Sequence, residues 1–253
     1  MSEEKGCTKF NAGHMENVPM RVAIMQPYFF PYIGYFQLLA SVDVFILYDD
    51  VNYIKKGWIN RNRVLGYNGE ITFSVPLSNP SQNLQINEVK ISNFTTFTKK
   101  FKRTLEHSYG KSKYYEQGLK YVDTVLSREV EKISELAAES IKAAAQIFEI
   151  QCNIFESSKD FSDSKGMERS QRLISMATQL SCTSYVNSIK GSFLYDRENF
   201  QSHGVELKFI KPEIITYEQF NSKKFIPGLS IIDMLMNLSV DEIQTHLKSY
   251  ELV

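Results

Sequence analysis

Charged and aromatic side chains crowd into residues 48–63, directly after an apolar run that predicts a buried strand. Asp49 and Asp50 stand at the end of that strand, where a carboxylate can accept a proton from an amine or a hydroxyl. We therefore expect both to be catalytic, although the same stretch could form a solvated turn with surface ion pairs. Lysine and arginine can hold phosphate, and tryptophan can stack on a sugar or a base. The side chains that we expect to bind substrate here are Tyr53, Lys55, Lys56, Trp58, Asn60, Arg61 and Asn62.

A second candidate segment, residues 25–36, joins a predicted strand to a predicted helix through two prolines and a glycine. Such a rigid loop delivers free backbone N–H groups at the start of a helix, where an anion can bind. We expect Tyr35 to take part in catalysis, and Gln26, Tyr28 and Tyr32 to bind substrate. The phenylalanines of the segment are expected to pack the helix onto a sheet, as apolar aromatic side chains usually do.

The second half of the chain offers a further candidate segment, residues 187–196, which follows a predicted strand and contains a glycine between hydroxyl-bearing residues. We expect Ser188, Ser192 and Tyr195 to bind the ligand from the opposite side of a cleft, beside residues 165–170, which open a predicted helix. Turns use the same residue types, so an ordinary turn is the alternative.

A predicted α/β fold positions these segments. Apolar runs predict strands at residues 21–26, 42–48, 152–156, 183–187 and 205–210, and helical spacing predicts helices at residues 32–40 and 166–180. Strands that alternate with helices indicate a mostly parallel, Rossmann-like sheet flanked by helices. Ligands bind outside the carboxyl ends of such strands. We therefore expect residues 26–27, 49–50 and 187–188 to meet at one edge of the sheet.

The chain of 253 residues is short enough to form one domain. Its expected segments are a disordered leader at residues 1–19, a first α/β half at 20–93, a helical insertion or lobe at 94–148 and a second α/β half at 149–253. Additional strands are predicted at residues 69–76 and 84–91. Residues 225–233 predict a turn that leads into a helix capped by Ser230.

Composition argues against several classes of function. Lys plus Arg and Asp plus Glu both number 29, so no global charge draws the chain to nucleic acid. Three cysteines without a CxxC spacing argue against a disulfide framework, and the spacing of the histidines predicts no metal site. No stretch reaches the roughly 20 apolar residues of a membrane span, and residues 1–19 lack the apolar region of a secretory signal. We expect a cytoplasmic protein.

Four stretches carry a resemblance to a known family, namely MQPYFFPYIGYFQLLASVDVFILYDDVNYIKKGWINRNR, KGMERSQRLISMATQL, SIKGSFLYD and FIPGLSIIDML. From about Met20 onward the chain resembles the WbqC-like family, which is found among bacterial O-antigen and capsule genes. The resemblance implies a transferase that attaches glycine or a related acyl group to an amino sugar. More loosely, Tyr32-Ile33-Gly34-Tyr35 lies where the HIGH-containing nucleotidyltransferase superfamily has its motif, with tyrosines in place of both histidines and no lysine-serine signature near the end.

The resulting hypothesis is a transferase of surface-polysaccharide biosynthesis that forms an amide between an acyl or amino-acid donor and a nucleotide-linked amino sugar. Whether the donor arrives activated or is activated here with ATP and Mg²⁺ stays open, as do the sugar, the acyl group and the oligomeric state. One alternative is an ATP-dependent, adenylyltransferase-like activating enzyme that works at residues 26–35. The other is a noncatalytic protein that docks a glycosyltransferase through exposed aromatic side chains.

Overall fold

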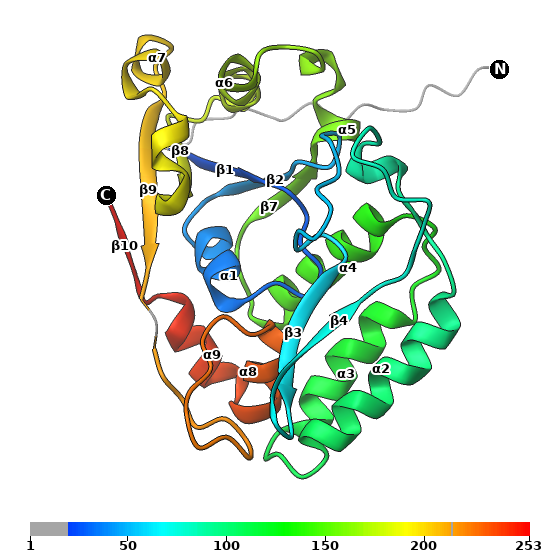
Figure 1. The fold of residues 1–253 in the computed structure, drawn as a ribbon. Helices are drawn as coiled ribbons and strands as arrows, with labels where there is room; N and C mark the ends of the chain where they lie inside the picture. The colour runs from blue at the N-terminus through cyan, green and yellow to red at the C-terminus, as the bar shows by residue number, and fades with distance from the viewer. Residues whose placement is uncertain (1–19, 214) are drawn as a thin grey trace, which may run out of the picture.

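A mostly parallel sheet forms the centre of the computed structural model, which describes residues 20–213 and 215–253 (Figure 1). The leader expected at residues 1–19 lies outside the described residues. Within the described part, six strands lie in the order β10-β9-β8-β1-β2-β7, and the pairing of β10 with β9 is the antiparallel one. These strands are β1 (Arg21–Met25), β2 (Val44–Leu47), β7 (Asn153–Glu156), β8 (Ser184–Ser188), β9 (Glu206–Pro212) and β10 (Tyr250–Leu252). The predicted α/β fold class is confirmed.

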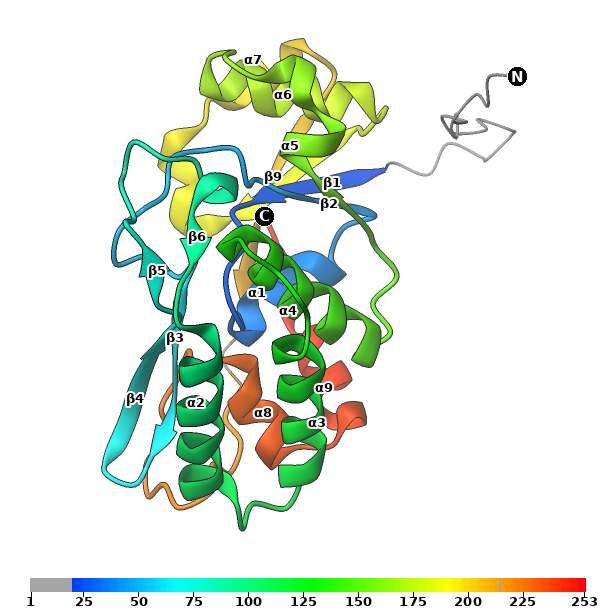
Figure 2. The same cartoon turned by 90° about the vertical axis from the view of Figure 1, so that its right-hand side faces the viewer.

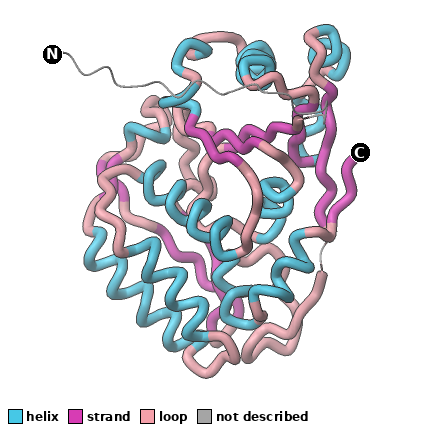
Figure 3. The backbone as a smooth tube through the Cα atoms, turned by 180° about the vertical axis from the view of Figure 1, so that it is seen from behind, coloured by secondary structure: helices cyan, strands magenta, loops and turns pink. Residues whose placement is uncertain are grey.

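Helices cover both faces of the sheet, because successive strand residues point to opposite faces and both sets are apolar (Figure 2). Val22 and Ile24 of β1 pack toward α6 (Arg169–Gln179) and α7 (Arg197–Ser202), close to the short helix α5 (Ser157–Asp160). Ala23 points to the other face. That face is covered by α1 (Ile33–Ala40) and α4 (Ile133–Ile147), and the same core continues to α9 (Val240–Leu247), which packs against α1, and to α8 (Ile231–Asn237). Figure 3 shows from behind how the strands pass between the two sets of helices.

A β-hairpin and two further helices extend the larger of the two hydrophobic cores, which lies on the Ala23 side of the sheet. The hairpin pairs β3 (Arg61–Gly66) with β4 (Gly69–Ser74), and it packs beside α2 (Phe94–Tyr109), which in turn contacts α3 (Tyr115–Leu126). Phe30 joins this region to the loop after β1, because its ring lies 6.3 Å from the ring of Phe101 and 5.3 Å from that of Tyr121. The division of the chain into the expected segments stays a prediction.

Two local predictions were wrong. The solvated turn considered for residues 48–63 does not reach their end, because β3 begins at Arg61 and alternates half-buried arginines with the buried Asn62 and Val64 in register with β4. Residues 84–91 were assigned to a strand. They instead contain a 3-10 turn at Ile86–Glu88, and only the last two residues, Lys90–Ile91, form β6, which pairs with β5 (Leu77–Ser78).

The expected helix start at Ser230 is confirmed, since its hydroxyl accepts a hydrogen bond from the N–H of Ile232 at 3.3 Å at the beginning of α8. Of the helices in the described ranges, none combines the length and the apolar character needed to cross a membrane.

Candidate functional site

The sheet has a topological switch point between β1 and β8, because the chain proceeds from β1 to β2 on one side and returns through β8 and β9 on the other. Crevices at such points are the usual ligand sites of parallel sheets. A cavity of about 1030 Å³ opens there. Gln26, Asp50 and Ser188, which follow or end three neighbouring strands, all line it, so the structure brings these sequence-predicted residues together.

The loop between β1 and α1 forms one wall of the cavity, and its backbone is tied down from several sides. Phe29 donates its N–H to the carbonyl of Trp58 at 3.0 Å. The carbonyl of Phe30 accepts from the amide of Asn62 at 2.7 Å and from the hydroxyl of Ser230 at 2.8 Å. Phe30 has a left-handed φ of 47°, an uncommon conformation that these contacts stabilise. The loop is thereby fixed in shape beside the cavity.

Three tyrosines of this wall face the cavity. The rings of Tyr28 and Tyr35 lie 5.5 Å apart, and the Tyr35 hydroxyl donates to the carbonyl of Gln26 at 3.1 Å. Burial raises the pKa of Tyr28 and Tyr32, and raises that of Tyr35 well above its ordinary value. These phenols are therefore neutral hydrogen-bond donors near neutral pH and not bases.

Gly34 allows one of these rings to approach the backbone closely. A Cβ at this position would lie 2.4 Å from the Cε2 atom of Tyr32, so any larger residue would push the ring away. The start of α1 also has no side-chain cap, since Tyr32 at the N-cap makes no capping hydrogen bond. Both the ring of Tyr32 and the first turn of α1 border the cavity.

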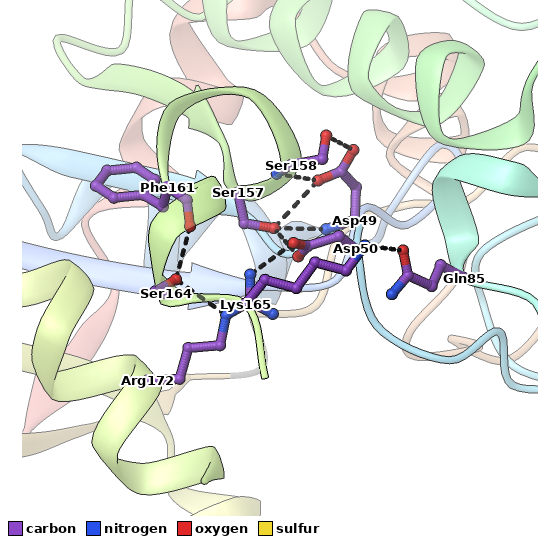
Figure 4. Close-up of polar contacts among 9 residues, drawn as sticks. All are labelled: Asp49, Asp50, Gln85, Ser157, Ser158, Phe161, Ser164, Lys165 and Arg172. Atoms are coloured by element: carbon purple, nitrogen blue, oxygen red, sulfur yellow. Dashed lines mark hydrogen bonds and ion pairs between the residues drawn. The ribbon is translucent and has the colours of Figure 1, made fainter. Parts of the chain in front are cut away.

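Behind the opposite wall, Asp49 and Asp50 join a buried polar network (Figure 4). The Ser157 hydroxyl lies 2.5 Å from Oδ1 of Asp50 and 3.1 Å from Oδ1 of Asp49. Asp49 also accepts from the backbone N–H of Ser158 at 2.9 Å and from its hydroxyl at 2.7 Å. The carboxylate of Asp49 therefore holds the start of α5, and it does not line the cavity.

Arg172 of α6 completes this network. Its guanidinium lies 2.6 Å from Oδ2 of Asp50, and the two side chains are only 5% and 2% exposed. Nε of Arg172 donates to the Ser164 hydroxyl at 3.1 Å, and the guanidinium lies 4.8 Å from the centre of the Tyr48 ring. Burying this ion pair is costly unless hydrogen bonds satisfy both charges, and here they do. The pair fastens α6 to the end of β2.

Residues 165–169 carry the same wall to the mouth of the cavity. Nζ of Lys165 donates to Oε1 of Gln85 at 3.2 Å (Figure 4). Arg169, at the start of α6, donates to the Tyr195 hydroxyl at 3.3 Å, and its guanidinium lies 5.5 Å from the centre of that ring. Glu168 caps the helix, because its carboxylate accepts from the N–H of Ser170 at 2.8 Å. This wall is therefore built from α6 and from the segment after β8.

The hairpin supplies the remaining border. Trp58 lines the cavity, with the guanidinium of Arg61 5.5 Å and that of Arg63 5.6 Å from its ring centre. Arg63 also pairs with Glu70 at 2.6 Å. Among the described residues, three arginines (63, 169 and 172) and one aspartate (50) line the cavity, a formal excess of two positive charges. In a chain with no net charge, this is a local concentration suited to an anionic ligand.

Comparison with known proteins identifies the family. The family model described as "WbqC-like protein family" matches residues 26–245, which is most of the chain. The chain belongs to the WbqC-like protein family. It is also similar to a curated Mycobacterium tuberculosis (strain ATCC 25618 / H37Rv) protein described as "Uncharacterized protein Rv1507c", with 26% identity over 227 residues that cover 87% of this chain and 95% of the relative. No solved structure gives a significant match.

In this WbqC-like protein, the cavity gathers part of the set of side chains expected to act on a ligand. The expected residues that line it are Gln26, Tyr28, Tyr32, Tyr35, Asp50, Trp58, Asn62, Ser188 and Tyr195. The expected residues that lie outside its lining are Asp49, Tyr53, Lys55, Lys56, Asn60, Arg61 and Ser192. The loop between β1 and α1, the wall at α6 and the hairpin therefore contribute to one site.

Most of the residues outside the lining have structural partners. The Tyr53 hydroxyl donates to Oδ1 of Asn60 at 2.9 Å, and the Asn60 amide donates to the carbonyl of Val75 at 2.9 Å. Arg61 donates to the carbonyls of Gly57, at 3.0 Å, and Lys56. The side chains of Lys55 and Lys56 are exposed to solvent. Ser192 lies in the 3-10 turn Ile189–Leu194.

Several residues that line the cavity were not among the individually expected site residues. Tyr48, Arg63, Arg169 and Asn187 lie within the candidate segments, whereas Arg172 and Tyr185 lie outside them. Arg172 had a detectable signal, because it lies four residues before the buried Met176 and so falls on the apolar stripe of α6. An arginine in such a stripe indicates a buried carboxylate partner.

The geometry of the described side chains gives no support for a metal site of three or more protein ligands. Within residues 20–213 and 215–253, no group of three or more His, Cys, Asp or Glu side chains is arranged to hold a metal ion. The two aspartates that could have met a nucleotide-bound Mg²⁺ are both engaged by serine or arginine.

Proposed function

We propose that this WbqC-like protein is an amide-forming transferase of surface-polysaccharide biosynthesis that binds a nucleotide-linked amino sugar in the cavity at the switch point. The observation that carries the proposal is the composition of the lining, which combines aromatic rings with an excess of arginine in a chain whose net charge is zero. Arginine suits phosphate groups, and aromatic rings stack on bases and sugars. Such a lining supports a ligand that has both.

The size of the cavity supports two reactants. Small-molecule sites commonly enclose about 300–1,000 Å³. The volume of about 1030 Å³ is slightly above that range, so the cavity can accept a nucleotide sugar together with the end of an acyl donor. Holding both reactants in contact is itself a large part of catalysis in such transfers.

The reaction we propose is an acyl transfer. The free amine of the sugar attacks the carbonyl carbon of the activated donor, a C–N bond forms, and the bond from that carbon to the leaving group breaks with its electron pair. The amine loses one proton, which the departing group carries away, while Asp50, the one carboxylate that lines the cavity in the described ranges, stays paired with Arg172. Tyr28 and Tyr32 are neutral donors at the cavity wall, suited to the negative charge that develops on the carbonyl oxygen.

A second candidate is ATP-dependent activation of the donor in the same cavity. The observation that favours it is the uncapped first turn of α1, which follows the loop after β1 and borders the cavity. Helix starts of this kind bind phosphate. This candidate predicts ATP consumption in the absence of any sugar.

The test is a product assay by mass spectrometry. The protein is incubated with nucleotide-linked amino sugars and, in separate reactions, with coenzyme A thioesters or with glycine and ATP. We expect a sugar product heavier by one acyl group. ATP consumption without sugar would favour the activating enzyme, and no turnover with any combination would contradict both enzyme functions and leave the noncatalytic partner.

Two matched variants make the assay specific to the cavity. Tyr28→Phe removes one hydroxyl that faces the cavity, and we expect kcat to fall about 10- to 100-fold. Tyr67→Phe makes the same change at an 89% exposed tyrosine of the hairpin turn and should leave kcat unchanged. Equal activity of the two variants would contradict the proposed role of Tyr28.

A further inference from the structure

The three arginines of the cavity differ in what already neutralises them. Arg172 is buried against Asp50 at 2.6 Å. Arg63 pairs with Glu70 at 2.6 Å and donates to the carbonyl of Gly228 at 3.2 Å. Arg169 has no ion pair among the described residues, and its polar contact is with the neutral hydroxyl of Tyr195. Arg169 therefore keeps an uncompensated charge at the cavity.

The carboxylate next to Arg169 in the chain is engaged elsewhere. Glu168 accepts hydrogen bonds from the N–H groups of Ser170 and Gln171, at 2.8 and 3.2 Å, and so caps its own helix. An N-cap carboxylate also interacts favourably with the positive end of the helix dipole. The charge of Arg169 is left for a ligand.

The network behind Arg169 holds the backbone of α6 at this point, and the side chain of Arg169 is exposed at the cavity. Arg172 lies one helical turn further along α6 and is anchored to Asp50 and to the Ser164 hydroxyl. The ring of Tyr195 supports the guanidinium of Arg169 from the side of the cavity lining. These contacts with Tyr195 reduce the side-chain conformational entropy that Arg169 loses when a ligand binds.

The other cations near the mouth are less suited to the same task. Lys55 and Lys56 are exposed and do not line the cavity. Arg61 already uses Nε and Nη2 to hold the carbonyls of Gly57 and Lys56. These three cations therefore lie outside the cavity lining, whereas Arg169, which is also exposed to solvent, is part of it.

We infer that Arg169 binds the diphosphate of a nucleoside-diphosphate-linked substrate and so sets the substrate class of the site. This inference rests on the proposed function and narrows it to one substrate class. A ligand with two adjacent phosphates presents several oxygens, and the planar guanidinium can donate two parallel N–H bonds to them. A nucleoside without phosphate gains nothing from this contact.

The test is calorimetric titration of UDP, GDP, CDP and dTDP, followed by the monophosphate and nucleoside of the tightest ligand. Arg169→Gln should weaken the diphosphate by about 10- to 100-fold and leave the nucleoside unchanged. Arg169→Lys should recover part of the affinity. Arg103→Gln makes the same substitution at an exposed position of α2, and it should bind like the wild type.

Three results would overturn the inference. The Arg169→Gln variant could bind the diphosphate as tightly as the wild type does, or the loss of diphosphate affinity could appear in Lys56→Gln instead. The nucleoside could weaken in parallel with the diphosphate, which would indicate a distorted cavity. In each case the proposed function stands if the wild type still binds and converts the nucleotide sugar. If the wild type binds none of the four diphosphates, both the inference and the proposal of a nucleotide-linked substrate are overturned.

Discussion

Two cation-bearing segments, the α6 wall of the cavity and the turn at residues 54–57, are built in opposite ways. At the α6 wall, Arg172 is buried, paired with Asp50 and hydrogen-bonded to the Ser164 hydroxyl. In the turn at residues 54–57, Lys55 and Lys56 are exposed, and Arg61 stabilises the turn by binding its carbonyls. The turn has the denser charge in the sequence, whereas the wall has the charge that the fold holds in place. Burial and partners, more than charge density, therefore distinguish a positioned cation from a solvated one.

The largest effect is expected from breaking the buried pair of the wall. Asp50→Ala leaves Arg172 uncompensated, so we expect the free energy of unfolding to fall by about 3–5 kcal/mol, measured by urea denaturation. The double variant Asp50→Ala with Arg172→Leu should recover much of this loss, because it removes both charges. Glu139→Gln, in the exposed pair with Arg128, should cost less than about 1 kcal/mol. A similar cost for both single variants would remove the contrast between buried and exposed charge.

A smaller loss is expected at Ser157, whose fully buried hydroxyl lies between the two aspartates. Ser157→Ala removes one donor and leaves both carboxylates less satisfied, so we expect a loss of about 1–3 kcal/mol in unfolding free energy. The control is Ser202→Ala, whose exposed hydroxyl donates to the carbonyl of Asn199 at the end of α7. If the two serine variants have equal stability, the network does not anchor the wall.

The turn should respond in the opposite direction. Lys56 has a φ of 60°, a left-handed conformation that glycine adopts more readily. Lys56→Gly keeps the carbonyl that Arg61 binds, and we expect the unfolding free energy to rise by up to about 1 kcal/mol.

Lys55→Gly is the matched control for the turn, because Lys55 is not among the residues with positive φ. This change should destabilise the protein by about 0.5–1 kcal/mol through the greater freedom of the unfolded chain. Destabilisation by both glycines would show that the turn is not strained at Lys56.

The smallest expected effect is a pH dependence at Glu156, at the end of β7 beside the wall. Burial alone would raise the pKa of this carboxyl, but hydrogen bonds and charges from Lys142 and Lys159 outweigh it and lower the pKa. The native carboxylate therefore binds protons more weakly than the unfolded one. Its contribution to stability is present above the ordinary pKa of 4.5 and is lost as pH falls through the lower, folded pKa.

Unfolding measured from about pH 7 to pH 3 tests this pH dependence. At pH 7 we expect the unfolding free energy of the wild type to be higher than that of Glu156→Gln by less than about 1 kcal/mol. The effect is small because both lysines are substantially exposed. The difference should vanish at the acid end. A difference that grew toward low pH would show that the sign is wrong.

Much of the fold could be predicted from local patterns. The buried runs of β1 and β2 are continuous because helices cover both faces, and that pattern is visible in the sequence. The hairpin strand β3 was not predicted, because its alternation begins with Arg61 and Arg63 and its partner, β4, is set by tertiary pairing. The antiparallel edge strand β10 has three residues, too few for a periodic pattern.

The candidate site was only partly predictable. Residues after β1, β2 and β8 could be assigned to one edge of the sheet by the rule for parallel strands. The sequence could not predict which of the two adjacent aspartates faces the cavity. Asp49 and Asp50 differ only in the partners that residues 157–172 bring to them. The role of Arg169 likewise depends on Glu168 being engaged as a helix cap.

The most direct test of the account is a crystal structure of the protein with a nucleoside-diphosphate-linked amino sugar. We predict that the ligand occupies the cavity at the switch point, with a phosphate oxygen at a hydrogen-bond distance of about 2.7–3.2 Å from the guanidinium of Arg169. Phosphates bound instead by Lys55 and Lys56, or a ligand outside the cavity, would contradict it.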